Sequence, residues 1–383
     1  MNFDFDTLPD RRPTGSTKWQ IFDEDVLPMW VADMDFRSPE PVIDALRERV
    51  EHGVFGYTRP SEGVTASVVE WLARRHGWSV DPGHVLFVPG VVVGFNQAAQ
   101  AVTLPGEGVL IQTPTYGPFL KVAENGGFVQ QEMEYARGEN GQYEIDLNAF
   151  EAAITSQTRV FMLCNPQNPT GRVFRKAELE AMAEICLRHN VVICSDEIHH
   201  DLVYSESKHI PMASLSPEIA ANTITLLAPS KTFNIAGLKA SVAVIENDEL
   251  RKKFEAAQRG LVGWVNLMAQ VAMQTAYEQG DAWLDALLVY LQGNRDYVTD
   301  FVEKELPGVR MAKPEGTYLA WLDCREAGIE GNPSEFFVKK ARVAMNDGAW
   351  FGAGGEGHVR FNFGSPRPVV EEALERMKTA LQA

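Results

Sequence analysis

Hydrophobic residues along the chain form short continuous runs that alternate with amphipathic stretches. Six runs predict buried strands, at residues 84–88, 108–112, 159–163, 191–196, 223–227 and 241–245. Between them, segments such as 95–102 and 176–190 carry apolar residues at helical spacing. Continuous apolar strands separated by helices are typical of a mostly parallel sheet that is covered on both faces. Ligands of such a sheet bind at the carboxyl ends of its strands, so polar residues at those ends are candidates for a functional site.

The pattern changes at about residue 285. A long helical stretch at 282–304 is followed by apolar runs at 317–323 and 358–363 and by helical patterns near 334–342 and from about 368. Strands and helices alternate less regularly here, which indicates a smaller α+β domain. We therefore expect three parts: an N-terminal segment, 1–45, packed on the small domain; a large domain, 46–284; and a small C-terminal domain, 285–383.

Composition and charge narrow the class of protein. The 383 residues are 45% hydrophobic and 23% charged, as in a soluble globular protein, and no run approaches the ~20 apolar residues of a membrane helix. A formal net charge of −17 argues against nucleic-acid binding, which needs a basic surface. The four cysteines lack CxxC spacing and three lie in apolar runs, so we expect buried free thiols in a cytoplasmic protein without a secretion signal.

A lysine follows one of the predicted strands. The run at 223–227 continues into Ala-Pro-Ser-Lys, which places Lys231 where a buried strand passes into a loop. A buried ammonium group is costly unless it is paired, neutralised or used covalently. Lys231 is therefore a candidate for covalent chemistry.

Two other strand ends are polar. The strand at 191–196 ends in the acidic and histidine-rich stretch "SDEIHHD", with Asp196 and His199. Metal binding is one alternative for this stretch, but H-x-x-x-H spacing is absent and adjacent histidines point to different faces, so we expect no metal. A structural role as a cap is another alternative. The strand at 159–163 leads into "NPQNPTG", which either forms a turn alone or fixes an asparagine amide toward a ligand.

Two glycine-containing segments are candidates for binding a phosphate group. In "VPGVVVGFNQAAQ" (88–100) a strand passes through glycine into a helix, whose first N–H groups can hold an anion. In "GAGGEG" (352–357) the letters fit G-x-G-x-x-G, but the segment neither follows a clear strand nor opens a helix. We therefore reject a dinucleotide site there.

A phosphate-holding helix start, a rigid asparagine turn, an acidic strand end and a lysine are the parts that pyridoxal-phosphate chemistry needs. With them come the ordered segments "MWVADMDF" (29–36), "FGYTRP" (55–60), "TPTYGPF" (113–119), "NPQNPTGRVF" (165–174), "SDEIHHDLVY" (195–204), "SKTFNIAGLK" (230–239), "EGTYLAWLD" (315–323) and "VRFNFGSPR" (359–367). In these segments the chain resembles the fold-type I pyridoxal-phosphate enzymes, and more narrowly the MalY/PatB-type C–S lyases. The resemblance covers nearly the whole chain and implies an α/β fold with a seven-stranded, mostly parallel sheet.

The resemblance also implies roles for single residues. It makes Lys231 the Schiff-base lysine and Asp196 the partner of the pyridinium nitrogen. Asn168 would face the phenolic oxygen of the cofactor, together with His199, where the wider superfamily often has tyrosine. Tyr116 would stack on the ring; a buried core tyrosine is the alternative.

The resemblance implies further contacts to phosphate and substrate. Phosphate would be held by the backbone of Val92 and Val93, by Ser230, by Lys239 in place of the more common arginine, and by Tyr57 of a second subunit. Relatives often have serine at position 228 and histidine at position 167, where this chain has alanine and glutamine. The substrate carboxylate would bind Arg360 and the backbone near Ala32. The alternative for Arg360 is a surface arginine on an edge strand.

The activity that the resemblance implies is β-elimination of cysteine thioethers, such as cystathionine, to a thiol, pyruvate and ammonia, in a homodimer with shared active sites. An aminotransferase is the main alternative, because it uses the same lysine, aspartate and arginine. An additional regulatory role, through binding of a transcription activator, is associated with part of this family and is a further alternative.

Overall fold

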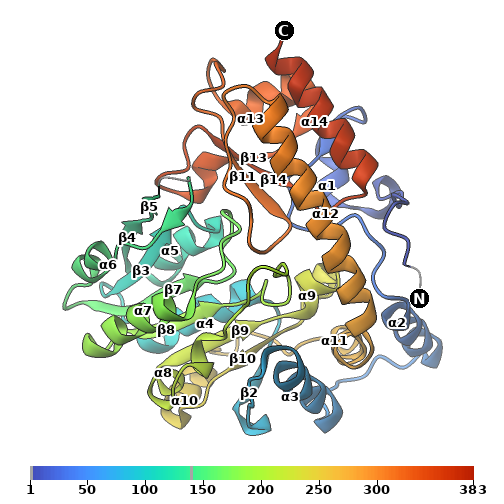
Figure 1. Ribbon diagram of the computed structural model, residues 1–383. Coiled ribbons are helices and arrows are strands. Elements are labelled where there is room, and N and C mark those ends of the chain that lie inside the picture. The colour runs from blue at the N-terminus through green and yellow to red at the C-terminus, as the bar shows by residue number, and fades with distance from the viewer. Residues whose placement is uncertain (1–2, 139–140) are drawn as a thin grey trace.

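The computed structural model describes residues 3–138 and 141–383, so residues 1 and 2 of the expected N-terminal segment lie outside the described residues. A seven-stranded sheet forms the lower part of the view in Figure 1, and a smaller sheet lies above it. The large sheet has the strand order β2-β10-β9-β8-β7-β3-β4. Its strands are β2 (Val85–Val88), β3 (Gly108–Thr113), β4 (Val129–Glu134), β7 (Thr158–Cys164), β8 (Val192–Asp196), β9 (Thr223–Leu227) and β10 (Ser241–Val244).

The mostly parallel, seven-stranded α/β sheet expected from the sequence is confirmed. β10 runs antiparallel to both of its neighbours, β2 and β9, and the pairs from β9 to β4 are parallel. All six strands predicted from apolar runs are present. The seventh, β4, lies at the edge of the sheet and exposes most of its side chains, so its sequence lacks the continuous apolar run of a buried strand.

Helices cover both faces of this sheet, which explains its continuous apolar strands. In β3, Val109 and Ile111 join the core cluster beneath α4 (Val91–Val102) and α10 (Asp248–Ala256). Leu110, between them, points to the other face and packs in the cluster beneath α7 (Lys176–Arg188). Because successive side chains of a strand alternate between faces, both faces must be apolar.

The small domain contains a second, antiparallel sheet. Its strands are β11 (Leu319–Asp323), β14 (His358–Asn362) and β13 (Asn346–Asp347), with β14 in the centre. The long helix α12 (Asp281–Glu305) runs from the large sheet up to this part of the molecule, beside the last helix, α14 (Arg367–Leu381) (Figure 1). The helix predicted near 334–342 is α13 (Pro333–Phe336) followed by a π-helical turn, Phe337–Ala341.

The N-terminal segment contacts this small domain. Its strand β1 (Leu27–Pro28) pairs in parallel with β12 (Val343–Ala344). The exact division at residues 45 and 284 stays a prediction. The remaining elements are α1 (Thr17–Gln20), α2 (Glu40–His52), α3 (Glu62–His76), α5 (Val122–Gly126), α6 (Leu147–Ala153), α8 (Pro217–Ala221), α9 (Pro229–Thr232), α11 (Leu267–Gln279) and the hairpin strands β5 (Ala136–Arg137) and β6 (Tyr143–Glu144).

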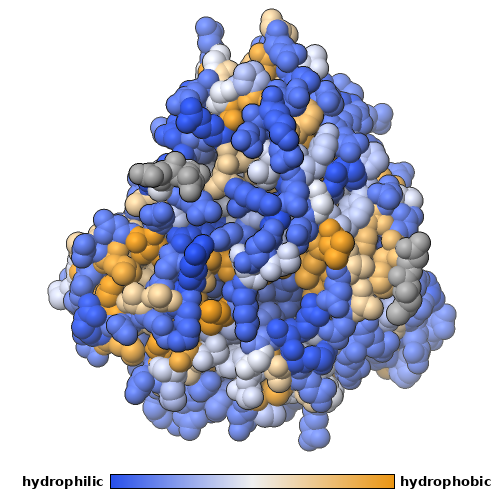
Figure 2. All heavy atoms as spheres, in the orientation of Figure 1, coloured by the Kyte–Doolittle hydropathy of each residue, from blue (hydrophilic) through white to orange (hydrophobic). Residues whose placement is uncertain are grey.

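Several sequence-based exclusions can be compared with this structure. All four cysteines are buried and free. The segment 352–357 forms turns between the 3-10 helix Gly348–Phe351 and β14, so it does not open a helix. Within residues 3–138 and 141–383, no helix has both the length and the apolar character that crossing a membrane requires. The face in Figure 2 is mostly hydrophilic, with hydrophobic side chains gathered in separate patches.

Candidate active site

Lys231 lies on the short helix α9, which begins two residues after β9 ends. Its Nζ donates a hydrogen bond to the carbonyl oxygen of Ala32, 2.6 Å away. Burial lowers the pKa of Lys231 to about 8, and the positive charge of Arg360 acts in the same direction, while the carboxylates of Asp33 and Asp196 oppose the shift. A lysine in this state has a substantial neutral fraction near neutral pH and can act as a nucleophile or a base.

Asp196 is the last residue of β8 and is buried. Burial raises its pKa to about 7, although the backbone N–H of Ile198 donates to its Oδ1 at 3.1 Å and the charge of Lys231 favours ionisation. No ion pair to the Asp196 carboxylate forms among the described residues. A buried carboxyl group without a cationic partner is therefore poised to bind a positively charged or proton-donating ligand atom.

His199 and Asn168 follow the carboxyl ends of neighbouring strands, β8 and β7. His199 is buried, and its Nδ1 has no hydrogen-bond partner among the described residues. Burial lowers the pKa of His199 well below its usual value, and the nearby charges of Lys231 and Arg360 add to the effect. The ring is therefore neutral and has a free polar atom.

Arg360 lies on the central strand of the small sheet and is only 3% exposed, so the alternative of a surface arginine on an edge strand is wrong. Its Nη1 donates to Oδ1 of Asn168 at 2.9 Å, and its Nη2 donates to Oδ1 of Asn346 at 2.7 Å and to the carbonyl oxygen of Trp30 at 2.9 Å. Its Nε has no partner among the described residues, and no carboxylate pairs with the guanidinium group. Burial lowers the pKa of Arg360 to about 10.

Tyr116 is partly buried at the start of the 3-10 helix Gly117–Lys121. Its ring meets the ring of Trp350 edge to face, with centroids 5.8 Å apart. Burial raises the pKa of Tyr116, and the charge of Asp196 acts in the same direction. Tyr116 therefore lies near the acidic strand end and is not wholly enclosed by the core, and its stacking on a cofactor ring stays a prediction.

Val92 and Val93 lie in the first turn of α4, and no side chain caps this helix start. Gly90 has φ 113°, a conformation that favours glycine, and a Cβ on Gly94 would lie 2.9 Å from the side chain of Leu226. Both glycines are thus needed to bring this helix start close to β9. The first N–H groups of a helix have no intrahelical acceptor and can bind an anion.

The other expected phosphate contacts differ in exposure. Ser230 is buried on α9, next to Lys231, whereas Lys239 is exposed and has a left-handed backbone with φ 58°. Tyr57 is fully exposed, at 103%. The structure brings Lys231, Asp196, His199, Arg360 and Asn168 together, but it shows no direct contact between this group and Tyr57 or Lys239 within the described chain.

The sequence did not predict the network that holds the loop "MWVADMDF". Tyr318 donates from its hydroxyl group to the carbonyl oxygen of Ala32 at 2.9 Å, the same oxygen that accepts from Lys231. Asn362 Nδ2 donates to the carbonyl oxygens of Val31 and Asp33. Tyr318 and Asn362 both lie in segments quoted from the sequence, "EGTYLAWLD" and "VRFNFGSPR", but no periodicity indicates which loop they contact.

The same loop is anchored from the N-terminal segment. The side chain of Lys18 is fully buried and pairs with Asp35, with Nζ 2.6 Å from Oδ2. Trp19 Nε1 donates to the other carboxylate oxygen of Asp35 at 2.9 Å. Arg11 pairs with both Asp33 and Asp35, at 2.6 Å each. These ion pairs hold the residues that follow Ala32 in the loop.

One histidine cluster lies beside the site. Ligand atoms of His76, His200 and Asp201 lie within 4.8 Å of one another. His199 and His200 point in different directions, as expected for adjacent residues, because His199 meets Tyr318 while His200 meets His76. The carboxylate of Asp201 accepts hydrogen bonds from Trp71 and Thr232 within the protein. The expectation that this protein binds no metal stays a prediction.

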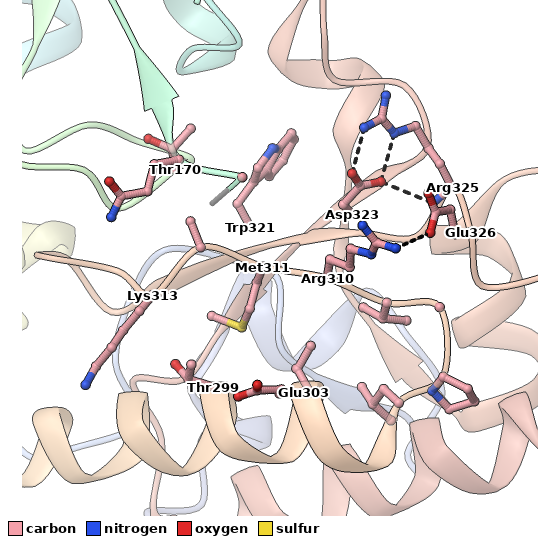
Figure 3. Close-up of a pocket in the computed structure, with 18 of the residues that line it drawn as sticks. Thr170, Thr299, Glu303, Arg310, Met311, Lys313, Trp321, Asp323, Arg325 and Glu326 are labelled. Atoms are coloured by element: carbon pink, nitrogen blue, oxygen red, sulfur yellow. Dashed lines mark hydrogen bonds and ion pairs between the residues drawn. The ribbon is translucent and has the colours of Figure 1, made fainter. Parts of the chain in front are cut away.

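A separate cleft of the described structure lies away from this site. It has a volume of about 1390 Å³ and is lined by α12, by the segment that follows it and by the end of β11 (Figure 3). Several of its charged side chains pair with one another, such as Arg310 with Glu326 and Arg325 with Asp323. Neither Lys231 nor Arg360 lines it. Lys231 and Asp196, with their shifted pKa values, and the unpartnered Nδ1 of His199 lie instead at the carboxyl ends of strands of the large sheet.

Pyridoxal phosphate fits the chemistry of these residues. The buried, unpartnered atoms His199 Nδ1 and Arg360 Nε need polar ligands, and the carboxyl group of Asp196 lacks a cation. A protonated ring nitrogen, a phenolic oxygen and a substrate carboxylate are groups of this kind. The uncapped start of α4 offers an anion site for the phosphate.

Comparison with known proteins gives the same result. The family model of class I and II aminotransferases matches residues 24–377. The chain is 42% identical to cystathionine beta-lyase PatB of Bacillus subtilis (strain 168), over 98% of this chain and 99% of that protein. It is 34% identical to protein MalY of Escherichia coli (strain K12), over 100% of this chain and 99% of that protein.

A solved structure also matches along its whole length. Cystalysin from Treponema denticola, whose crystal structure contains a pyridoxal 5'-phosphate cofactor, superimposes with a TM-score of 0.95. It is 34% identical, and the match covers 100% of this chain and 99% of that one. The chain therefore belongs to the class I and II aminotransferase family of fold-type I pyridoxal-phosphate enzymes, and within it to the MalY/PatB-type carbon–sulfur lyases.

Proposed function

We propose that this enzyme catalyses β-elimination on cysteine thioethers, either cystathionine or cysteine S-conjugates, and releases a thiol, pyruvate and ammonia. The observation that carries the proposal is the meeting of Lys231, Asp196 and Arg360 in one buried site, where none of the three forms an ion pair with any residue that the structure describes. The names of the relatives, cystathionine beta-lyase and cystalysin, support the choice of reaction.

Lys231 moves the proton in this proposal. When bound, pyridoxal phosphate supplies an aldehyde that condenses with amines and a ring that accepts the electron pair left at the substrate Cα. Lys231, with its pKa lowered to about 8, takes the proton from Cα. Its Nζ can then return that proton to the sulfur that leaves Cβ, because one flexible side chain reaches both atoms of the same substrate.

Asp196 keeps a proton on the nitrogen of the cofactor ring. Its raised pKa of about 7 reflects burial without a partner, and a cationic N–H group would restore its ionised form. Asn168 turns Oδ1 toward Arg360, which leaves its Nδ2 to donate to the phenolic oxygen. The free Nδ1 of His199 can serve the same oxygen. Tyr116 covers the ring by stacking.

Arg360 binds the carboxylate of the substrate. Asn168, Asn346 and the carbonyl of Trp30 hold its guanidinium plane, so a carboxylate meets a group that is already oriented and whose Nε–H is free. The backbone near Ala32 assists, because Tyr318 and the ion pairs of Asp33 and Asp35 fix this loop. Val92, Val93, Ser230 and Lys239 hold the phosphate; lysine at position 239 retains the charge but lacks the bidentate geometry of arginine.

We further propose a homodimer in which Tyr57 completes the phosphate site of the second copy. Large hydrophobic side chains are exposed around it, at Val54, Phe55, Leu261 and Trp264. The guanidinium group of Arg59 lies 5.3 Å from the ring of Trp264, which joins the two segments into one surface. An apolar surface of this kind is typical of an interface between subunits.

A substrate assay tests the reaction. The purified protein, loaded with pyridoxal phosphate, is incubated with cystathionine and, separately, with an S-alkyl cysteine, both without a keto acid. Steady release of pyruvate and thiol supports β-elimination. Turnover that requires an added keto acid would instead identify an aminotransferase, since Lys231, Asp196 and Arg360 serve both reactions.

Co-expression tests the shared site. Neither Lys231→Ala nor Tyr57→Ala homodimers should eliminate efficiently, whereas a mixed dimer contains one site with both native residues. Recovered activity in the mixture, with a dimer mass from light scattering, supports the proposal. A monomer of full activity would contradict it.

A further inference from the structure

A buried carboxylate lies directly behind the residues of the proposed active site. Asp201 comes two residues after His199 and is buried. Its Oδ2 accepts a hydrogen bond from the hydroxyl group of Thr232 at 2.7 Å. Its Oδ1 accepts from Trp71 Nε1 at 3.0 Å and lies 2.8 Å from His76 Nε2. None of the steps of the proposed reaction uses Asp201.

Asp201 connects three separate parts of the chain. Trp71 and His76 belong to α3, and Asp201 itself belongs to the loop that follows Asp196, the last residue of β8, and that carries His199. Thr232 is the neighbour of Lys231 on α9. The strands β8 and β9 pair along their length, and the last backbone contact between them joins Glu197 N to Leu226 O at 2.9 Å. Beyond that point, the bond from Thr232 to Asp201 links the two segments.

The negative charge of Asp201 strengthens the hydrogen bonds that make this connection. Burial favours the neutral form, but the histidines His200 and His76 and the hydroxyl group of Thr232 hold the pKa of Asp201 well below its usual range. An ionised carboxylate only accepts hydrogen bonds, so Thr232 and Trp71 must both donate to it. Hydrogen bonds to a charged acceptor are shorter and stronger than neutral ones, which fixes the orientation of Thr232.

We propose that Asp201 is a positioning residue, which through Thr232 sets the place of Lys231 relative to Asp196 and His199. The inference rests on the proposed function, because it concerns the distance between the lysine that moves the proton and the carboxyl group that holds the ring nitrogen. Lys231 and Asp196 lie on different segments, and a small displacement of one against the other misaligns proton transfer.

The chain offers a matched control for this idea. Thr225 on β9 and Thr232 on α9 are both completely buried. Thr225 Oγ1 has no hydrogen-bond partner among the described residues, whereas Thr232 Oγ1 donates to Asp201. Threonine to valine keeps the shape of the side chain at either position. Thr225→Val therefore removes a hydroxyl group without a bond, and Thr232→Val removes one that holds Asp201.

The experiment compares Thr232→Val, Thr232→Ser and Thr225→Val in the holoenzyme. We expect Thr232→Val to lower kcat about 10- to 100-fold while KM changes little, because misplacement affects the transition state more than substrate binding. We also expect a weaker circular dichroism of the cofactor band and faster hydrogen exchange at residues 228–235. Thr232→Ser keeps the hydroxyl group and should restore kcat and dichroism, and Thr225→Val should resemble the wild type.

The outcomes separate this inference from the proposed function. A Thr232→Val protein of lower thermal stability but unchanged kcat and dichroism would overturn the positioning role, as would equal losses in Thr225→Val. If Thr232→Val does not fold, Asp201→Asn takes its place, and unchanged kcat and dichroism in that variant would also overturn it. A wild type that binds no cofactor or releases no pyruvate counts against the proposed function instead.

Discussion

The Nζ of Lys231 and the hydroxyl group of Tyr318 both donate to the carbonyl oxygen of Ala32, at 2.6 Å and 2.9 Å. One backbone oxygen thus joins the large domain, the strand region of the small domain and the N-terminal loop. The contact gives the ammonium group of Lys231 a hydrogen-bond acceptor within the protein, while burial lowers the pKa of Lys231 to about 8. Lys231 is held, but by a neutral acceptor that does not stabilise its charge as a carboxylate would.

Replacement of Lys231 by alanine tests whether this residue carries the chemistry. We expect the absorption band of the lysine-bound cofactor to disappear and elimination to fall by at least about 10²–10⁴-fold, the share that a general acid–base contributes. Absorbance spectra and pyruvate release measure the two effects. Lys121→Ala, which removes an exposed lysine paired with Glu124, is the control and should behave as the wild type.

Asp196 should make the stability of the cofactor-free protein depend on pH. Its pKa is raised from 3.8 to about 7 in the folded protein, so between these values the folded state holds a proton that the unfolded state has lost. The free energy of unfolding should therefore fall as the pH rises from about 4 to about 7. Urea unfolding across this range measures the slope.

The variant Asp196→Asn provides the comparison. It cannot ionise, so the part of the slope due to this residue should vanish in the cofactor-free protein. The loaded variant should bind cofactor but eliminate about 10²–10³-fold more slowly, because an electrostatic contact to the developing charge is lost. Equal slopes in wild type and variant would contradict the raised pKa.

Arg360→Lys tests carboxylate binding. Lysine keeps the positive charge but cannot form two parallel hydrogen bonds, so kcat/KM should fall about 10- to 100-fold. Saturation kinetics with a thioether substrate measure this loss. If the substitution raises KM, a higher substrate concentration should restore part of the rate. Arg310→Lys, at an exposed pair with Glu326 in the same part of the chain, should leave kcat/KM within about twofold.

The buried pair of Lys18 and Asp35 predicts a large effect on stability. Lys18→Met would remove one of the two cations that lie 2.6 Å from the carboxylate of Asp35, the one whose own side chain is fully buried. Breaking a buried pair from one side costs about 3–5 kcal/mol of unfolding free energy. Arg47→Met breaks an exposed pair with Asp44 and should cost less than about 1 kcal/mol. Denaturant unfolding distinguishes the two variants.

Most of the fold follows from hydrophobic patterning, and its misses have physical reasons. The runs at 108–112 and 159–163 predict β3 and β7 because helices cover both faces of these strands. The strand β4 lies at the edge of the sheet, and four of its six residues are polar, so it carries no such run. The predicted helix at 334–342 ends in a π-helical turn, a change of hydrogen bonding that apolar spacing does not encode.

The residues of the candidate site likewise fall into those that hydrophobic patterning locates and those that it does not. Lys231, Asp196 and Asn168 follow strand ends, so the parallel sheet alone brings them to one edge. Arg360, Asn346 and Tyr318 come from the small sheet, and only tertiary packing decides that they face the large domain. Lys18 holds Asp35 of the loop "MWVADMDF" from 17 positions away, and Asn234, whose Oδ1 accepts from the backbone N–H of Met34 at 3.0 Å, holds the loop from 200 positions away. Such contacts leave no periodic signal in a single sequence.

The pairing of β1 with β12 has a consequence for the order of synthesis. Asp25, just before β1, bonds to Arg342, which is 317 positions further along the chain. A ribosome therefore releases the whole large sheet before the partner of β1 exists. The loop around Ala32 can reach its final position only near the end of translation, so a nascent chain can assemble the strands that carry Asp196 and Lys231 long before Arg360 can join them.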